Sequence, residues 1–198
     1  MAWTQRLVFS GCSRTLAVLE VIVEQNNGTQ SRREQPPLHV RYVEIDGGDW
    51  RFQPRVAAVC VWRNHVLLQG ALDGDFWVLP GGRVLPLEVT PSALQRTLGW
   101  EWAQDITVGH LLWVMEYVTT IGGRPTHELG FYYSITLPDT SPFLDLTVDH
   151  AAVERGHDLL LRWFPVDDVP DLRLFPEFLR TALRRLPEHP THIVQVDT

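Results

Sequence analysis

The segment from Trp77 to Gln104 constrains the fold more than any other part of the sequence, because an apolar run, a glycine turn, a loop and a helix follow one another in it. The apolar run ends at Pro80-Gly81-Gly82, where two adjacent glycines after a proline let the backbone turn sharply and expose its carbonyls and amides. Thr90 is a good N-cap, and Pro91 suits the first helical position. The segment therefore predicts a strand, a turn, a loop and a helix that reaches Trp100.

The spacing of residues in this segment resembles the Nudix box of the Nudix hydrolases. The family pattern is Gly-x5-Glu-x7-Arg-Glu-U-x-Glu-Glu-x-Gly-U, where U is an aliphatic residue. The residues that match it are Gly82, Glu88, Arg96, Leu98 and Glu101. Thr97 and Trp100 stand where the family has glutamates, and Ala103 and Gln104 replace the final Gly-U pair. The matches and the preceding Trp-x-Leu-Pro-Gly-Gly turn together indicate membership of the family.

The resemblance implies a fold for most of the chain. We expect an α+β protein with a Nudix-like α/β/α sandwich, in which helices cover a mixed β-sheet. The resemblance covers roughly residues 55–187. We therefore divide the chain into an N-terminal extension, residues 1–50, packed on the main domain, and a Nudix-like domain, residues 51–198.

Hydrophobic patterning predicts the elements around this segment. Residues 16–23 are apolar and rich in β-branched side chains, which favours a strand, although a buried helix fits nearly as well. The other predicted elements are a hairpin over 40–52, a central strand over 55–62 with its partner over 65–69, two long strands over 106–120 and 126–137, a polar loop over 138–157, a strand over 159–164, an amphipathic helix over 177–186 and an edge strand over 192–196.

The resemblance also implies a metal site on the helix. The three glutamates of the family's box are related as i, i+3 and i+4, so their side chains share one face of the helix. Carboxylates with a carbonyl of the glycine turn suit Mg²⁺, with Mn²⁺ as an alternative, and the ion activates water for attack on phosphorus. In this chain that face reads Thr97, Trp100 and Glu101, so one carboxylate remains.

The candidate site residues fall into three groups. Gly82, Glu101 and Glu128 are the candidate metal ligands, and Glu101 and Glu128 are also the candidate catalytic residues. Glu128 lies on a predicted strand after the box, where several enzymes of the family carry a base or an additional metal ligand. The resemblance implies that Glu88 and Arg96 pair to lock the loop to the helix. The candidate substrate-binding residues are Trp77, Arg83 and Tyr132, although aromatic residues at such positions are more often part of the core.

Composition restricts the partners. A net charge of −7 argues against binding to nucleic acid backbones, which requires a basic surface. The two cysteines, Cys12 and Cys60, form neither a disulfide framework nor a metal cluster, and Cys60 lies in an apolar run that indicates a core position. No apolar stretch approaches the length of a membrane span. We therefore expect a cytoplasmic protein with no membrane contact, and the resemblance implies a small nucleotide as its ligand.

Three functions remain open. The first is Mg²⁺-dependent hydrolysis of a pyrophosphate linkage in a nucleoside diphosphate derivative, with attenuated activity because two carboxylates are missing. The second is a catalytically inactive Nudix-fold module that binds nucleotides or regulates another protein. The third is a structural partner, in which the N-terminal extension builds a homodimer.

Overall fold

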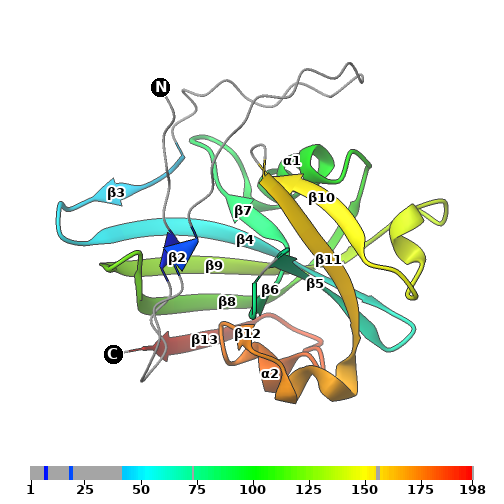
Figure 1. Ribbon diagram of the computed structural model, residues 1–198. Helices are drawn as coiled ribbons and strands as arrows, with labels where there is room; N and C mark the ends of the chain where they lie inside the picture. Colours follow the sequence, from blue (N-terminus) through cyan, green and yellow to red (C-terminus); the bar gives the residue numbers. More distant parts are fainter. Residues whose placement is uncertain (1–6, 9–17, 20–41, 73, 155–156, 198) are drawn as a thin grey trace.

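The computed structural model describes residues 7–8, 18–19, 42–72, 74–154 and 157–197 (Figure 1). In the N-terminal extension, β1 (Leu7–Val8) and β2 (Val18–Leu19) pair in antiparallel fashion. The alternatives predicted for residues 16–23 and the packing of the extension on the main domain otherwise fall outside the described residues. The division of the chain at residue 50 and the homodimer stay predictions.

In the described part of the chain, eleven strands join in one mixed sheet, whose main path runs β10-β11-β5-β4-β9-β8-β13. The β4–β9, β8–β13 and β6–β12 pairs are parallel, and the remaining pairs are antiparallel. The strands are β3 (Ile45–Asp46), β4 (Arg51–Trp62), β5 (His65–Ala71), β6 (Trp77–Val78), β7 (Gly81–Arg83), β8 (Thr107–Ile121), β9 (Arg124–Thr136), β10 (His150–Glu154), β11 (His157–Pro165), β12 (Leu174–Phe175) and β13 (Thr191–Val196).

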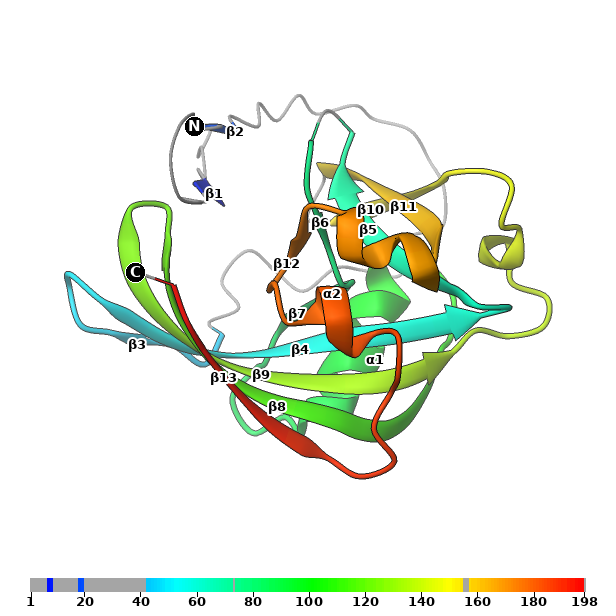
Figure 2. The same cartoon turned by 90° about the horizontal axis from the view of Figure 1, so that it is seen from below.

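The helices lie on opposite sides of this sheet. In Figure 1, α1 (Thr90–Glu101) lies above β4, β9 and β8, and α2 (Leu179–Ala182) lies below them. The view from below shows α2 in front of the curved strands and α1 behind them (Figure 2). Two short 3₁₀ helices, η1 (Pro142–Leu144) and η2 (Val166–Asp171), connect the later strands. The predicted α+β fold with helices around a mixed sheet is confirmed.

Strand β4 is the centre of the fold because it pairs with β3, β5, β7 and β9. Its side chains alternate between the two faces of the sheet, so they supply two cores. Val56 and Cys60 belong to the core under α1, and Ala57 and Val59 belong to the core under α2. Cys60 is the buried core residue predicted from the sequence, and burial raises the pKa of its thiol to about 12.

The turns that join the strands follow their sequence signals. Gly122 and Gly123 connect β8 to β9 with φ of 62° and 76°, in the left-handed region that glycine tolerates best. The Arg63-Asn64 turn connects β4 to β5. β3 pairs with the start of β4 across Gly47-Gly48, which is the glycine hairpin expected from the sequence. These turns bring strands that are consecutive in the chain side by side.

The start of α1 differs from the prediction by one residue. Val89 occupies the N-cap position and Thr90 is already helical. The Thr90 hydroxyl lies 2.6 Å from the Tyr133 hydroxyl of β9, and the Val89 side chain makes no capping hydrogen bond. The threonine that could have capped the helix therefore connects the helix to the sheet instead.

The polar loop predicted over residues 138–157 is wrong in part, because it contains η1 and β10. β10 pairs with β11 on one side only, so it is an edge strand. His150 and Ala152 are buried, while Ala151 between them is exposed. A short edge strand with polar residues gives a pattern like that of a loop.

The amphipathic helix predicted over 177–186 is much shorter in the structure. Only α2 is regular helix, although its predicted apolar residues Leu179 and Leu183 are buried in the core. After α2 the amides of Arg184 and Arg185 bond to the third carbonyl before them, at 3.3 Å each. Bonds of this kind tighten the chain into 3₁₀ geometry, which keeps the apolar face but ends the α-helix.

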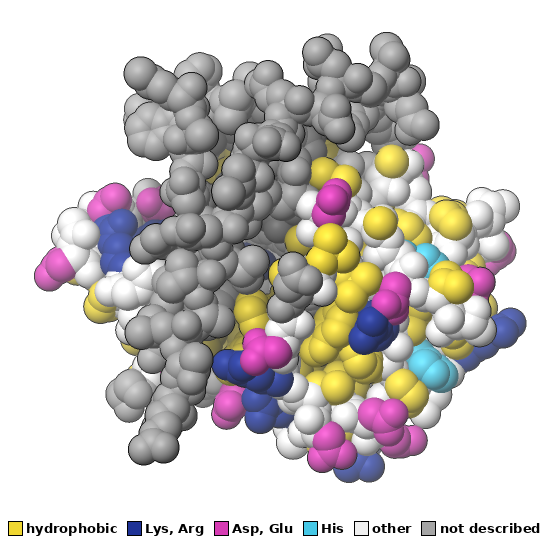
Figure 3. Space-filling view, in the orientation of Figure 1, with side chains coloured by type: hydrophobic (Ala, Val, Ile, Leu, Met, Phe, Trp, Pro, Cys, Tyr) yellow, Lys and Arg dark blue, Asp and Glu magenta, His cyan; other side chains and the backbone are white. Residues whose placement is uncertain are grey.

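The surface has a hydrophobic area on one face. In the space-filling view, hydrophobic side chains gather where β5, β6 and β11 lie in Figure 1 (Figure 3). In the part of the chain that the structure describes, no helix is long and apolar enough to cross a membrane.

Two glycine substitutions test the packing of the glycine turn. A Cβ on Gly81 would lie 2.1 Å from the Val56 carbonyl oxygen, so Gly81→Ala must displace β7 from β4 and should lower the free energy of unfolding by about 1–3 kcal/mol. Gly99 in α1 is the matched control, since its nearest atom to a new Cβ is 3.8 Å away. Gly99→Ala should stabilise the protein by about 0.5–1 kcal/mol, because alanine favours the helix. Urea denaturation measures both changes in the free energy of unfolding. Equal changes for the two variants would contradict the close packing of β7 on β4.

Candidate active site

The glycine turn lies directly against the C-terminal half of α1. In β7, Gly82 pairs with Val56 of the central strand. A Cβ on Gly82 would lie 2.7 Å from Cγ2 of Thr97, a distance that real Cβ atoms do not reach. Only glycine therefore lets the turn approach the helix so closely, and Thr97 fills the contact.

Arg96 holds the loop, the turn and the helix together. Its Nε and one terminal nitrogen donate to the two carboxylate oxygens of Glu88, at 2.6 Å and 2.8 Å. The same terminal nitrogen donates to the Arg83 carbonyl at 2.9 Å. The Arg96 guanidinium also lies over the ring of Trp100, 4.9 Å from its centroid. One side chain thus contacts three separate parts of the predicted box.

Glu88 completes this arrangement from the loop side. Its carboxylate also accepts a hydrogen bond from the Leu85 amide at 2.9 Å, so the loop closes on itself. Burial by itself would raise the Glu88 pKa, but the hydrogen bonds from Arg96 and from the Leu85 amide outweigh it and hold the pKa below its ordinary value. The ionised form of Glu88 is therefore favoured by folding.

The helix face that carries the family's carboxylates is used for packing in this chain. Thr97 is 7% exposed and lies against Gly82, and Trp100 stacks on Arg96. Glu101, at the end of α1, is the one carboxylate left of the three. Among residues 42–72, 74–154 and 157–197, no group of three His, Cys, Asp or Glu side chains is placed to hold a metal ion. The donor set therefore does not fit the three-carboxylate metal site of the family.

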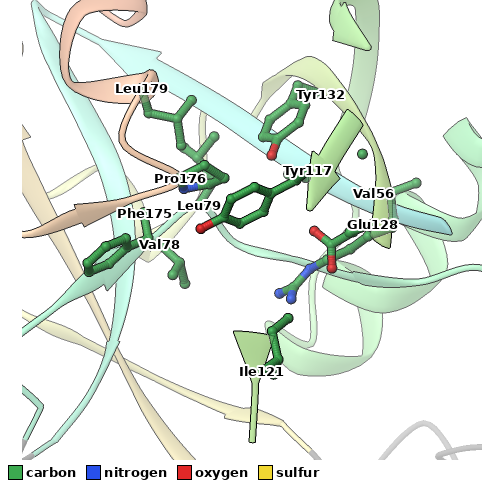
Figure 4. Close-up of a pocket in the computed structure, with 13 residues that line it drawn as sticks. Val56, Val78, Leu79, Tyr117, Ile121, Glu128, Tyr132, Phe175, Pro176 and Leu179 are labelled. Carbon is green, nitrogen blue, oxygen red and sulfur yellow. The ribbon is translucent and has the colours of Figure 1, made fainter. Parts of the chain in front are cut away.

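A pocket lies on the other face of the central strands, between β4, β8 and β9 and the segment around α2 (Figure 4). Its polar side chains are Arg55, Tyr117, Glu128 and Tyr132, and Figure 4 shows the Tyr117 ring between Glu128 and Phe175. The apolar residues that line it are Val56, Ala57, Val78, Leu79, Ile121, Phe175, Pro176 and Leu179. An aromatic and aliphatic lining with a few polar groups is typical of a site for a small ligand.

Glu128 belongs to this pocket. It is 6% exposed, and its Oε2 accepts a hydrogen bond of 2.9 Å from Nε2 of Gln53, which is 4% exposed. The Glu128 carboxylate points into the pocket beside Tyr117 (Figure 4). A buried carboxylate with one fixed oxygen is positioned to bind a ligand or to accept a proton from it.

The candidate substrate-binding residues occupy different places. Tyr132 lines the pocket, and its hydroxyl donates to Sδ of Met115 at 3.3 Å. The Trp77 ring instead packs on Phe164, with ring centroids 4.7 Å apart. Arg83 pairs with Glu44 at 3.2 Å and lies over the Tyr42 ring. Of these three side chains, the pocket includes only that of Tyr132.

Four further residues in or beside the pocket were not predicted from the sequence: Gln53, Arg55, Tyr117 and Phe175. The first two occupy alternate positions of β4, and Tyr117 lies opposite Glu128 in β8. Alternation along the predicted strand could have placed Gln53 and Arg55 on one face. Their neighbours, however, depend on the strand order and the register, which no local pattern specifies.

The fold and the site define an α+β protein in which a glycine turn and a helix are tied together beside a small-ligand pocket. The sequence matches the NUDIX domain over residues 51–186, more than half of the chain, and the protein therefore belongs to the Nudix family.

Two solved structures are similar to this chain. The mutator MutT protein from Bacillus halodurans is similar with a TM-score of 0.50 and 19% identity, over 73% of this chain and 90% of that one. The MutT NUDIX hydrolase from Burkholderia pseudomallei has a TM-score of 0.47 and 23% identity, over 69% and 98% of the two chains. No curated protein matches the sequence.

The Glu88–Arg96 pair makes a testable contribution to stability. Both side chains are 14% exposed, so Arg96→Ala should lower the free energy of unfolding by about 1–3 kcal/mol, more than an exposed pair would. Arg96→Lys keeps the charge but loses the bidentate contact with Glu88. Its free energy of unfolding should therefore lie between those of the wild type and Arg96→Ala. A melting temperature of Arg96→Ala equal to that of the wild type would contradict the pairing.

The same pair predicts a dependence on pH. Folding lowers the Glu88 pKa below its ordinary 4.5. The contribution of the Glu88–Arg96 pair to the free energy of unfolding is therefore complete above pH 4.5, and it is lost as the pH falls through the folded-state pKa. The stability difference between the wild type and Arg96→Ala should therefore shrink below about pH 4. Denaturation curves between pH 7 and pH 3 measure this stability difference. A difference that stays constant over this range would exclude ionised Glu88 as the partner of Arg96.

Proposed function

We propose that the protein binds a nucleoside diphosphate derivative in the pocket and cleaves its pyrophosphate linkage only slowly. Nudix hydrolases bind nucleotide-type substrates, and the chain keeps the family's turn, loop and helix in register. The observation that carries the proposal is the contact of Thr97 with Gly82, which fills the place of a family carboxylate with a packed side chain. Binding is retained in this proposal, and turnover is reduced.

The position of the pocket supports this assignment. Val56 and Ala57, which pair with Gly82 and Gly81, also line the pocket. A ligand in the pocket would thus lie across one strand from the glycine turn. Leu79 and Phe175 would offer this ligand an apolar contact surface, and Glu128 and Arg55 would offer it polar groups.

The reduced turnover follows from the charge of the helix face. Pyrophosphate cleavage develops negative charge on the phosphoryl oxygens, which must be neutralised. The family typically uses divalent metal ions for this, and α1 retains Glu101 alone of its three carboxylates. Glu101 remains the proposed catalytic residue on α1, and Glu128, in the pocket on the other face of the sheet, is proposed to bind the ligand. On the helix side, Gly82 and Glu101 would hold Mg²⁺ or Mn²⁺ only weakly, and Glu128 is not proposed as a third ligand because its carboxylate lies in the pocket on the other face of the central strands.

A second function is a module that binds the nucleotide without turnover. The specific observation in its favour is that Thr97 and Trp100 both have structural contacts of their own, with Gly82 and with Arg96. Residues in the places of two metal ligands have become parts of the packing. The two functions differ in the rate at which the bound nucleotide is cleaved, which a sensitive assay measures directly.

Titration calorimetry followed by a turnover assay tests the proposal. The protein should bind at least one member of a panel of nucleoside diphosphates and nucleoside diphosphate sugars, and MgCl₂ alone should bind weakly. Turnover in MgCl₂ should fall far below about 1 s⁻¹, the lower end of ordinary enzyme rates. Turnover at ordinary rates would refute the attenuation, and an absence of binding across the panel would refute the pocket assignment.

Restoring the carboxylates provides the complementary test. Thr97→Glu with Trp100→Glu returns three carboxylates to one helix face at i, i+3 and i+4, and should raise both Mg²⁺ affinity and hydrolysis. Glu101→Gln in that background should abolish both gains. Thr97 is buried, so circular dichroism must first show that the variant folds. A folded variant with unchanged Mg²⁺ affinity and no hydrolysis would show that the metal face lies elsewhere.

A further inference from the structure

The sheet places three polar side chains next to one another at the floor of the pocket. In the register of the sheet, Gln53 of β4 lies opposite Glu128 of β9, and Glu128 lies opposite Tyr117 of β8. Directly opposed residues of neighbouring strands project from the same face. The three therefore form a row across the sheet, although 64 positions separate Gln53 from Tyr117.

The hydrogen bonds of this row leave acceptors available. Gln53 uses Nε2 to bond Glu128, which directs its Oε1 elsewhere. Oε1 of Gln53 is buried and accepts no hydrogen bond from the residues that the structure describes. A buried polar atom of this kind is rare in proteins and calls for a partner. The Gln53–Glu128 pair is thus held in place and is rich in acceptors.

The two tyrosine protons of the pocket are already used. The Tyr117 hydroxyl donates to Asp197 at 2.5 Å, and the Tyr132 hydroxyl donates to Sδ of Met115 at 3.3 Å. Burial raises the pKa of both phenols, so both stay protonated at neutral pH. The hydroxyl protons therefore do not compete for the acceptors of Glu128.

The charges of the pocket favour a neutral group over a phosphate. Arg55 contributes one guanidinium, and Glu128 contributes one carboxylate. Most of the remaining lining is aliphatic or aromatic, including Leu79, Phe175 and Pro176. A phosphate would meet the Glu128 carboxylate in an apolar environment, where like charges repel strongly. A flat neutral ring with polar atoms along one edge matches both the lining and the charges.

We propose that the pocket binds a guanine base, whose edge is recognised by Glu128 and Arg55. A carboxylate accepts two neighbouring N–H groups, and a guanidinium donates to a neighbouring oxygen. Guanine presents this order along one edge: an amino group, a ring N–H and a carbonyl oxygen. Adenine and cytosine place an acceptor beside their amino group, and uracil has a single donor. This assignment rests on the proposed function and names the base of its ligand.

A comparison of GDP with IDP tests the proposal on the unaltered protein. The two nucleotides differ only in the amino group of guanine, which is absent from IDP. Calorimetric titration in MgCl₂ should give an affinity for GDP at least about tenfold higher than for IDP, because a site that hydrogen-bonds a group rejects the analogue without it. ADP and UDP should bind no better than IDP. Equal affinities for GDP and IDP, or a preference for ADP or UDP, would overturn the assignment.

Two matched substitutions locate the effect. Glu128→Gln replaces one acceptor oxygen by an amide donor, so the ratio of GDP to IDP affinities should fall to within about threefold. Glu116→Gln is the control, since Glu116 precedes Tyr117 on β8, projects from the opposite face and bonds Nε2 of His192 at 2.9 Å. Glu116→Gln should keep the wild-type ratio. An unchanged ratio in folded Glu128→Gln would overturn the role of Glu128.

The titrations also separate this proposal from the function on which it rests. If nucleotides bind without preference between GDP and IDP, the proposed nucleotide site stands and the guanine assignment fails. If no nucleoside diphosphate binds at all, both fail. If GDP is preferred in the wild type and in Glu116→Gln but not in Glu128→Gln, both are supported.

Discussion

The interaction on which the box depends is that of Arg96 with Glu88. Two hydrogen bonds connect helix to loop, a third from Arg96 reaches the Arg83 carbonyl beside the glycine turn, and Trp100 covers the guanidinium. A planar guanidinium is suited to this task, because it donates in several fixed directions at once. The side chain of Arg96 therefore holds the glycine turn, the loop and α1 in a common geometry.

This arrangement explains how the chain can keep the fold while its helix loses two carboxylates. The stabilising contacts of Arg96 are made by a guanidinium and a carboxylate, whereas the family's metal site is made by a separate set of glutamates on the helix. Thr97 and Trp100 stand at two of these glutamate positions and make packing contacts, with Gly82 and with Arg96 respectively. The contacts that hold α1 in place therefore do not require the family's glutamates at these two positions.

The pocket arises from a different principle, the alternation of side chains along strands. Residues at every second position of β4, β8 and β9 meet on the face that α2 covers, and Gln53, Glu128 and Tyr117 lie in one row across these strands. The C-terminal part of the chain completes this face. Asp197, directly after β13, accepts the Tyr117 hydroxyl, and Phe175 and Pro176 form a wall of the pocket. The proposed ligand pocket is therefore built in part from segments that lie outside the Nudix box.

The sequence by itself determined the elements whose signals are local. The glycine turn, α1, the two long strands joined at Gly122-Gly123 and the central strand β4 follow from turn residues, spacing and apolar runs within a few positions of one another. The family and its fold followed from the same spacing. The predictions were least accurate where local signals were weak, as in the edge strand β10 and the short helix α2.

Only the tertiary structure decided which side chains share a site. Glu128 was a candidate from its position after the box, but its partner Gln53 lies 75 residues away and meets it only through the parallel pairing of β4 with β9. Thr97 could be identified as a missing carboxylate from the sequence, yet its packing against Gly82 depends on how closely the turn approaches the helix. The physical reason is that contacts between strands depend on their order and register, whereas turn chemistry and hydrophobic periodicity act within a single element.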